Sequence, residues 1–248
     1  MKRRESSTTA VALLCALIIG HYAAPSQALI DLEWRPMAQC IELDDVVEIG
    51  LYAVSDDPEL DQLLSAIDVI FAWDPAYLEL LGVVDPGYPN WIFSGFSNDP
   101  YGLNETIPPQ DGDGIYTALG PLGVPIPATP GGTLVTTFQF RALQVVDETW
   151  VEILESAGSP PGQTIVYDGT VPGLDVTGEL GDARLGVVLC SGDLNDDGEI
   201  GLSDLAQLLA HYDMTSGAVP GDGDMDCDGD VDLSDLAALL AVYNTTCE

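Results

Sequence analysis

The chain of 248 residues carries 41 acidic against 6 basic side chains, a formal net charge of −35. A field of this sign repels nucleic acid and anionic membrane surfaces, so the sequence argues against both as partners. After position 28, His211 is the one histidine left, which excludes a Ser-His or Cys-His nucleophile from the region that precedes it. Pairs of Asp and Glu side chains are so numerous in this chain that no single pair indicates a glycoside hydrolase. We therefore expect a protein that is not an enzyme.

The N-terminal segment 1–28 has the three parts of a secretory signal peptide. A basic start, Met1-Lys-Arg-Arg4, precedes an apolar stretch over 9–20 and a run of small residues that ends at Ala28. The apolar stretch is shorter than the ~20 residues that a membrane-spanning helix needs. We expect cleavage after Ala28 and a secreted chain, whose 40 acids and three arginines leave a net charge of −37.

Short alternating segments fill residues 29–189 and predict β-strands. Clusters of Gly, Pro and Asp at 85–87, 111–114 and 129–132 separate these segments. The apolar or inward-facing residues that carry the alternation are Val47, Ile49, Leu51 and Ala53; Ile67, Val69, Phe71 and Trp73; Leu134, Thr136, Phe138 and Phe140; and Val151 and Ile153. About 160 residues of this kind predict a mainly β sandwich of two sheets with its own core.

Three short motifs within this region resemble cohesin modules and related carbohydrate-binding-like sandwiches. They are Asp74-Pro-Ala-Tyr-Leu-Glu-Leu80 after a predicted strand, Gly131-Gly-Thr-Leu-Val-Thr-Thr-Phe-Gln-Phe140 at the opening of a later strand, and Asp175-Val-Thr-Gly178 before the last one. The resemblance implies a cohesin-like fold of the immunoglobulin or jelly-roll type. An immunoglobulin-like sandwich outside that family remains the alternative.

The C-terminal region contains a duplicated acidic segment. The stretch 192–212 recurs as 223–243, with 13 of 21 aligned positions identical. A calcium loop of the EF-hand type takes its ligands from positions 1, 3, 5, 7, 9 and 12 and places glycine at position 6. Gly198 and Gly229 occupy that sixth position. A single segment of this kind is also typical of an acidic Asp-Gly linker, but two in matching register favour two bound Ca²⁺ ions.

The register assigns ligands to each loop. Position 9 is Gly201 in the first loop and Asp232 in the second. Position 8 is β-branched in both, and we expect Ile200 and Val231 to pair the two loops and become buried beneath them. The predicted ligands are Asp193, Asn195, Asp197, the backbone carbonyl of Glu199 and Asp204 in the first loop, and Asp224, Asp226, Asp228, the carbonyl of Asp230 and Asp235 in the second.

An amphipathic helix is predicted after each loop. The apolar residues have i, i+3, i+4, i+7 spacing, and they are Leu205, Leu208, Leu209 and Tyr212, then Leu236, Leu239, Leu240 and Tyr243. No helix is predicted before either loop, because residues 184–190 read as a strand and residues 216–222 as a connector rich in Gly and Pro.

Paired calcium half-hands without entering helices, with Asp at position 12, resemble the type I dockerin module over residues 190–248. The resemblance implies two calcium ions and docking onto a cohesin-type module. The residues expected to contact that partner depart from many family members: Leu202-Ser203 and Leu233-Ser234 stand in place of Ser/Thr pairs, and Leu209-Ala210 and Leu240-Ala241 in place of basic residues. Calcium binding therefore carries over more fully than the identity of the partner.

Four cysteines follow the signal peptide, Cys40, Cys190, Cys227 and Cys247. An even number in an exported chain favours disulfides, and three pairings are open. Because the resemblance places the two ends of a dockerin module close together, it implies a Cys190–Cys247 bond. The alternative is Cys40–Cys190 with Cys227–Cys247.

The combined interpretation is a secreted, calcium-binding assembly protein: a signal peptide (1–28), a cohesin-like sandwich (29–189) and a dockerin-like module (190–248). Its expected partner is a cohesin-type module, in a polysaccharide-degrading or cell-surface complex, or its own sandwich in cis or in trans. The alternative is a carbohydrate-binding sandwich, tethered by the dockerin-like module, with Trp91 as the best candidate for an exposed sugar platform. The acidic turn at Asp111 and Asp113 is a candidate for a third, weaker ion.

Overall fold

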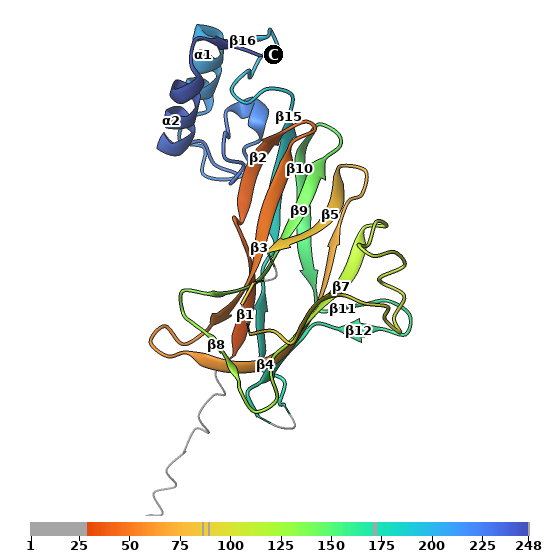
Figure 1. Ribbon diagram of the computed structural model, residues 1–248. Helices are drawn as coiled ribbons and strands as arrows, with labels where there is room; N and C mark the ends of the chain where they lie inside the picture. Colours follow the sequence, from red (N-terminus) through yellow and green to blue (C-terminus); the bar gives the residue numbers. More distant parts are fainter. Residues whose placement is uncertain (1–28, 86, 89, 171–172, 248) are drawn as a thin grey trace, which may run out of the picture.

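A computed structural model describes residues 29–85, 87–88, 90–170 and 173–247. The predicted signal peptide, at 1–28, lies outside this described part of the chain. Figure 1 shows two packed sheets, with a pair of helices gathered at one end of them beside β2, β15 and β10. Among the described residues, no helix is both long and apolar enough to cross a membrane.

The first sheet has five strands in the order β14-β1-β3-β9-β5. Its neighbours pair antiparallel, except that β1 and β14 run parallel. The strands are β1 (Ile30–Arg35), β3 (Val46–Ser55), β5 (Leu78–Asp85), β9 (Thr133–Ala142) and β14 (Thr177–Leu180).

The second sheet follows the order β2-β15-β10-β4-β7-β6, and β8 and β13 also pair with β4. Strands β2 and β15 run parallel, and β15 pairs on its other side with β10. The edge strand β2 is thus connected to the centre of the sheet through β15. The bounds are β2 (Ala38–Glu42), β4 (Gln62–Trp73), β6 (Phe93–Phe96), β7 (Asp113–Leu119), β8 (Ile126–Ala128), β10 (Val146–Leu154), β13 (Ile165–Asp168) and β15 (Ala183–Val188), with a separate hairpin of β11 (Ser156–Ala157) and β12 (Gly162–Gln163).

The inner faces of the two sheets enclose one apolar core, which confirms the predicted mainly β sandwich. Phe138 of β9 lies at its centre, with ring centroids 4.9 Å from Phe71, 5.3 Å from Tyr116 and 5.5 Å from Trp34. The predicted inward residues of β3, β4 and β10 are all buried. Strands with a period of two place every second side chain on one face, which is why the alternation located this core.

The prediction that the Leu134 side chain faces the core is wrong. The ladder between β3 and β9 pairs Leu51 with Thr136 but Tyr52 with Leu134, so Val135 is an extra residue at a β-bulge. Beyond the bulge the facing of the strand is reversed: Val135 is fully buried and Leu134 is only half-buried. A bulge inserts one residue into one strand, and simple alternation cannot register that insertion.

A second, smaller core holds the C-terminal module together. Ile200, Leu208, Ala218, Val231 and Leu239 form it. The two α-helices of the described chain follow the two loops as predicted. The elements are α1 (Leu202–His211), α2 (Leu233–Val242), a 3₁₀ turn η1 (Pro220–Asp222), and the short strands β16 (Glu199–Ile200) and β17 (Thr245–Thr246).

We expected the two loops to pair with each other at position 8. Each loop pairs instead with the segment that follows the helix of the other repeat. Ile200 pairs with Thr245, and Val231 pairs with Met214. Both residues are nevertheless buried, at 3% and 0% exposure. The prediction of burial was correct and that of the partner was wrong, because each helix reverses the chain and returns it to the other loop.

Candidate metal centre

The second loop brings its carboxylates into two overlapping clusters that share Asp235, and the predicted ligand Asp228 belongs to neither. Side-chain oxygens of Asp224, Asp226 and Asp235 lie within 4.8 Å of one another, as do those of Asp230, Asp232 and Asp235. Asp224 and Asp235 are fully buried. Spacing of this size suits a calcium ion, whose oxygen ligands lie at ~2.3–2.6 Å.

Backbone amides hold these carboxylates in position. Asp235 accepts hydrogen bonds from the N–H groups of Met225 (2.6 Å) and Asp232 (2.7 Å), and Asp224 accepts one from Gly229 (3.0 Å). Asp235 is the third residue of α2, so it also caps that helix. The backbone amides of the loop thus fix the orientation of both carboxylates.

The electrostatics of the second loop favour a cation. One oxygen of Asp224 and one of Asp230 are buried without any hydrogen-bond partner among the described residues. Burial raises the pKa of Asp224 above its usual value, and burial together with Asp235 and Asp228 raises the pKa of Asp226 to about 6. Buried carboxylates that repel each other are stabilised by an opposite charge. The residues present therefore fit Ca²⁺.

The first loop repeats these backbone hydrogen bonds, but its ligand side chains are more exposed to solvent. Asp193 accepts from the N–H groups of Asp197 and Gly198, and Asp204 accepts from Leu194 and Gly201. The structure thus brings Asp193 and Asp204 into the same positions as Asp224 and Asp235. Asp204 is buried and Asp193 is half-buried, while the remaining predicted ligands lie nearer the solvent at the rim: Asn195, Asp197 and Glu199.

Left-handed backbone shapes both loops identically. Position 4 has φ of 60° at Asp196 and 61° at Cys227, and position 6 has φ of 84° at Gly198 and 96° at Gly229. Glycine adopts this region without steric cost, which explains the repeated glycine of the sequence.

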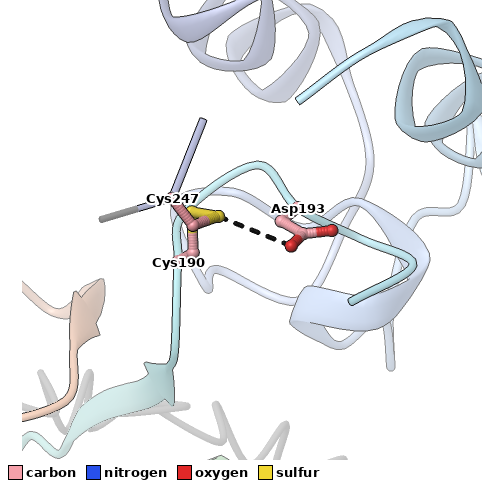
Figure 2. A group of neighbouring side chains, drawn as sticks. All are labelled: Cys190, Asp193 and Cys247. Atoms are coloured by element: carbon pink, nitrogen blue, oxygen red, sulfur yellow. Dashed lines mark hydrogen bonds between the residues drawn. A yellow bond between two sulfur atoms is a disulfide. The ribbon is translucent and has the colours of Figure 1, made fainter. Parts of the chain in front are cut away.

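Two disulfides frame the loops, Cys190–Cys247 and Cys40–Cys227. The Cys190–Cys247 bond implied by the dockerin resemblance is confirmed, and the alternative pairing is wrong. Figure 2 shows the Cys247 sulfur beside Asp193, at 3.4 Å. Since both sulfurs are joined to each other, neither donates a proton or ligates a metal, so this trio is not a metal site.

Arg184 is the site residue that the sequence analysis missed. From β15 it reaches into the second loop, with Nη1 donating to Asp224 (3.1 Å) and to the carbonyl of Cys227 (2.7 Å) and Nη2 to the carbonyl of Ala218 (2.8 Å). A signal was available: only three arginines and no lysine follow position 28. In so acidic a chain, an arginine inside a predicted strand is an expected partner of a buried acid.

The helices bury only part of their predicted apolar stripe. Leu208 and Leu239 are fully buried, whereas Leu209 and Leu240 are each 52% exposed. Neighbouring residues of a helix point ~100° apart, so packing one turns the next away from the core. The two repeats therefore present matching exposed apolar side chains: Leu202 and Leu209 on α1 with Tyr212 directly after it, and Leu233 and Leu240 on α2 with Tyr243 directly after it.

Trp91, the best candidate among the tryptophans for an exposed platform, is half-buried. Trp91 packs against the sandwich core, at 6.4 Å and near right angles to Tyr88. Trp150 on β10 is 38% exposed and lines an open groove of about 470 Å³ with Tyr77, Glu148 and Glu152. Trp150 alternates with buried Thr149 and Val151, so its outward direction was readable from the period of the strand.

The acidic turn proposed for a third ion does not form a comparable centre. Asp111 is exposed and Asp113 is half-buried, and neither belongs to a metal-sized cluster of the described residues. Burial and the neighbouring charge of Asp111 raise the pKa of Asp113.

Comparisons with solved structures find cohesin modules. The sixth cohesin of scaffoldin B from Acetivibrio cellulolyticus, solved in complex with a dockerin, has a TM-score of 0.46 and 12% identity, over 64% of this chain and 99% of that one. The cohesin module of a Clostridium perfringens family 33 glycoside hydrolase has 0.45 and 9%, over 65% and 98%. A type I ScaB cohesin from Pseudobacteroides cellulosolvens has 0.45 and 11%, over 65% and 94%. These values describe a distant likeness and do not define what this chain binds.

No protein-family model matches the chain, and no curated protein matches its sequence.

Proposed function

We propose that this chain is a secreted, non-catalytic assembly protein whose C-terminal helices dock onto a cohesin-type module when calcium fills the two loops. The observation that carries the proposal is the close correspondence of two loop–helix units, each with the same ligand positions and the same exposed leucines. An acidic linker, even a duplicated one, is not expected to repeat a buried carboxylate and an exposed leucine at equal spacing.

Calcium has a structural role in this proposal. Asp193, Asn195, Asp197, the Glu199 carbonyl and Asp204 would hold one ion, and Asp224, Asp226, Asp228, the Asp230 carbonyl and Asp235 the other. The ions would neutralise converging carboxylates, and the binding free energy would then stabilise the folded loops and helices.

The exposed leucines supply the docking surface. Leu202 and Leu233 are 72% and 67% exposed, and both lie at the start of a helix beside a loop. Apolar side chains that remain in water at equivalent positions of a repeat are typical of an interaction surface. The dockerin resemblance assigns the partner, a β-sandwich of the cohesin type.

The exposure of these leucines also bears on the cis alternative. Since Leu209 and Leu240 are both half in solvent, the chain's own sandwich does not cover the helical surface in this structure. The sandwich contacts the loop side of the module instead, through Arg184 and the Cys40–Cys227 bond. Docking is therefore proposed in trans, onto another molecule.

A capture experiment tests the proposal. The full chain is immobilised and exposed to the native secretome in calcium or in chelator, beside a Leu209→Asp, Leu240→Asp variant. We expect a protein with a cohesin-type module to be captured in calcium alone, and about thirtyfold or more weakly by the variant, as for loss of ~2 kcal/mol at an interface hot spot.

A matched variant controls for the added charge. Leu60→Asp with Leu122→Asp changes two leucines of the sandwich that are 61% and 86% exposed, and it should capture as the wild type does. Equal capture by both variants, or capture that persists in chelator, would contradict docking through calcium-folded helices.

The exposed Trp150 supports carbohydrate binding as a second candidate function. Its ring borders the groove of Tyr77, Glu148 and Glu152, and an aromatic ring with nearby carboxylates suits the face and the hydroxyls of a sugar. Affinity electrophoresis on soluble polysaccharides should retard the wild type and Trp91→Ala but not Trp150→Ala. Unretarded wild type on every polysaccharide would remove this candidate.

A further inference from the structure

The sandwich places a positive charge inside the second loop. The Arg184 side chain is 8% exposed and bonds with Asp224, which is 0% exposed, and its Nε also donates to Glu148 at 3.2 Å. The same guanidinium holds two carbonyls of the module, those of Ala218 and Cys227. A buried charge with this many partners is well satisfied, and removing it would leave Asp224 uncompensated.

Arg184 occupies one of the two oxygens of Asp224 and leaves the other free. Oδ2 accepts from Arg184 and from the Gly229 amide, while Oδ1 is the buried oxygen without a partner among the described residues. The guanidinium and a metal ion therefore have separate oxygens on the same carboxylate. The loop has a charge-compensating group even before calcium arrives.

The first loop has no such group in the part of the chain that the structure describes. The sequence from 190 to 248 contains neither lysine nor arginine, and the two other arginines of the described chain pair with Glu33 and Glu79 in the sandwich. Asp193, the equivalent of Asp224, accepts its N–H hydrogen bonds from the amides of Asp197 and Gly198. The two loops are equivalent in backbone but unequal in charge.

A disulfide fixes the same contact. Cys227, at position 4 of the second loop, bonds to Cys40 on β2. The strand beside it has Gly186, where an added Cβ would lie 2.3 Å from the Cys227 sulfur, so only glycine allows this approach. The second loop is thus held on the sandwich both covalently and by charge.

We propose that Arg184 is a resident cation of the second loop, which keeps that loop and its contact with the sandwich formed without calcium, whereas the first loop requires calcium. This inference rests on the proposed calcium function and assigns its regulation. The calcium concentration controls the α1 half of the docking surface, whereas the α2 half stays formed without calcium.

Hydrogen–deuterium exchange of the oxidised full chain tests this asymmetry. In chelator, the amides of Met225 and Gly229 should exchange about tenfold or more slowly than their equivalents Leu194 and Gly198, because a charged hydrogen bond protects the second loop. Calcium should slow exchange in the first loop. Equal, rapid exchange of both loops in chelator would overturn the proposal.

Variants identify the cause. Arg184→Gln should raise exchange of the second loop in chelator to the rate of the first, and calcium should restore its protection. Arg184→Lys, which keeps the charge, should retain protection, and Arg141→Gln, at an exposed pair with Glu79, should change neither loop. Protection that survives in Arg184→Gln would show that the disulfide alone holds the loop and would overturn the proposal. Calcium without effect on either loop would instead reject the calcium function itself.

Discussion

Replacing Asp235 with alanine is expected to remove calcium binding at the second loop and to destabilise α2. The Asp235 carboxylate is fully buried and is the acceptor for the amides of Met225 and Asp232. Each buried N–H that loses its acceptor costs about 1–3 kcal/mol, so the change acts on folding as well as on the ion. Calorimetric titration should find one calcium equivalent in place of two, and circular dichroism should show lost helix.

Two further variants make this result interpretable. Asp204→Ala should remove the other equivalent, because Asp204 holds the corresponding amides in the first loop. Glu199→Gln should keep both, since that residue would offer only its backbone carbonyl. Two unchanged binding sites in Asp235→Ala would refute the ligand assignment.

Phe138→Ala is expected to remove about 3–5 kcal/mol from the free energy of unfolding of the sandwich. Phe138 is fully buried and lies on β9 of one sheet, while its neighbours Phe71 and Tyr116 belong to β4 and β7 of the other. The ring therefore joins the two sheets, and its loss leaves a cavity between them. Whole domains have stabilities of ~5–15 kcal/mol, so this is a large fraction.

Urea denaturation followed by tryptophan emission measures the effect, because Trp34 lies 5.5 Å from Phe138 and is itself buried. Phe93→Ala is the matched control: Phe93 is 40% exposed on the edge strand β6, and its loss should change stability by less than about 1 kcal/mol. Similar midpoints for the two variants would contradict a core centred on Phe138.

The sandwich and the loops were largely predictable because their signals are local. Alternation located the inward residues of β3, β4 and β10, and the spacing of aspartate and glycine located both loops. The error at Leu134 has a local cause too, since one extra residue at Val135 reversed the facing of the strand. Nothing in the spacing of β-branched residues distinguishes a regular strand from a bulged one.

What could not be predicted depends on contacts between distant segments. Arg184 and Asp224 are 40 positions apart, and Cys40 and Cys227 are 187 apart, so no window of sequence contains either pair. The burial of Trp91 likewise depends on how the segment that carries it packs against the sandwich core. The Cys190–Cys247 bond was predictable only because the resemblance brought the ends of the module together.

The crossed pairing of the C-terminal module makes its two repeats mutually dependent. The amide of Asn244 donates to the carbonyl of Ile200, and the amide of Asp213 donates to that of Val231, so each repeat lends its tail to the other. The donors occupy equivalent positions of the two repeats, and so do the acceptors. A single repeat would leave both its loop edge and its tail without backbone partners. Duplication is thus a condition for this module to exist as a closed unit, rather than an increase in its capacity for calcium.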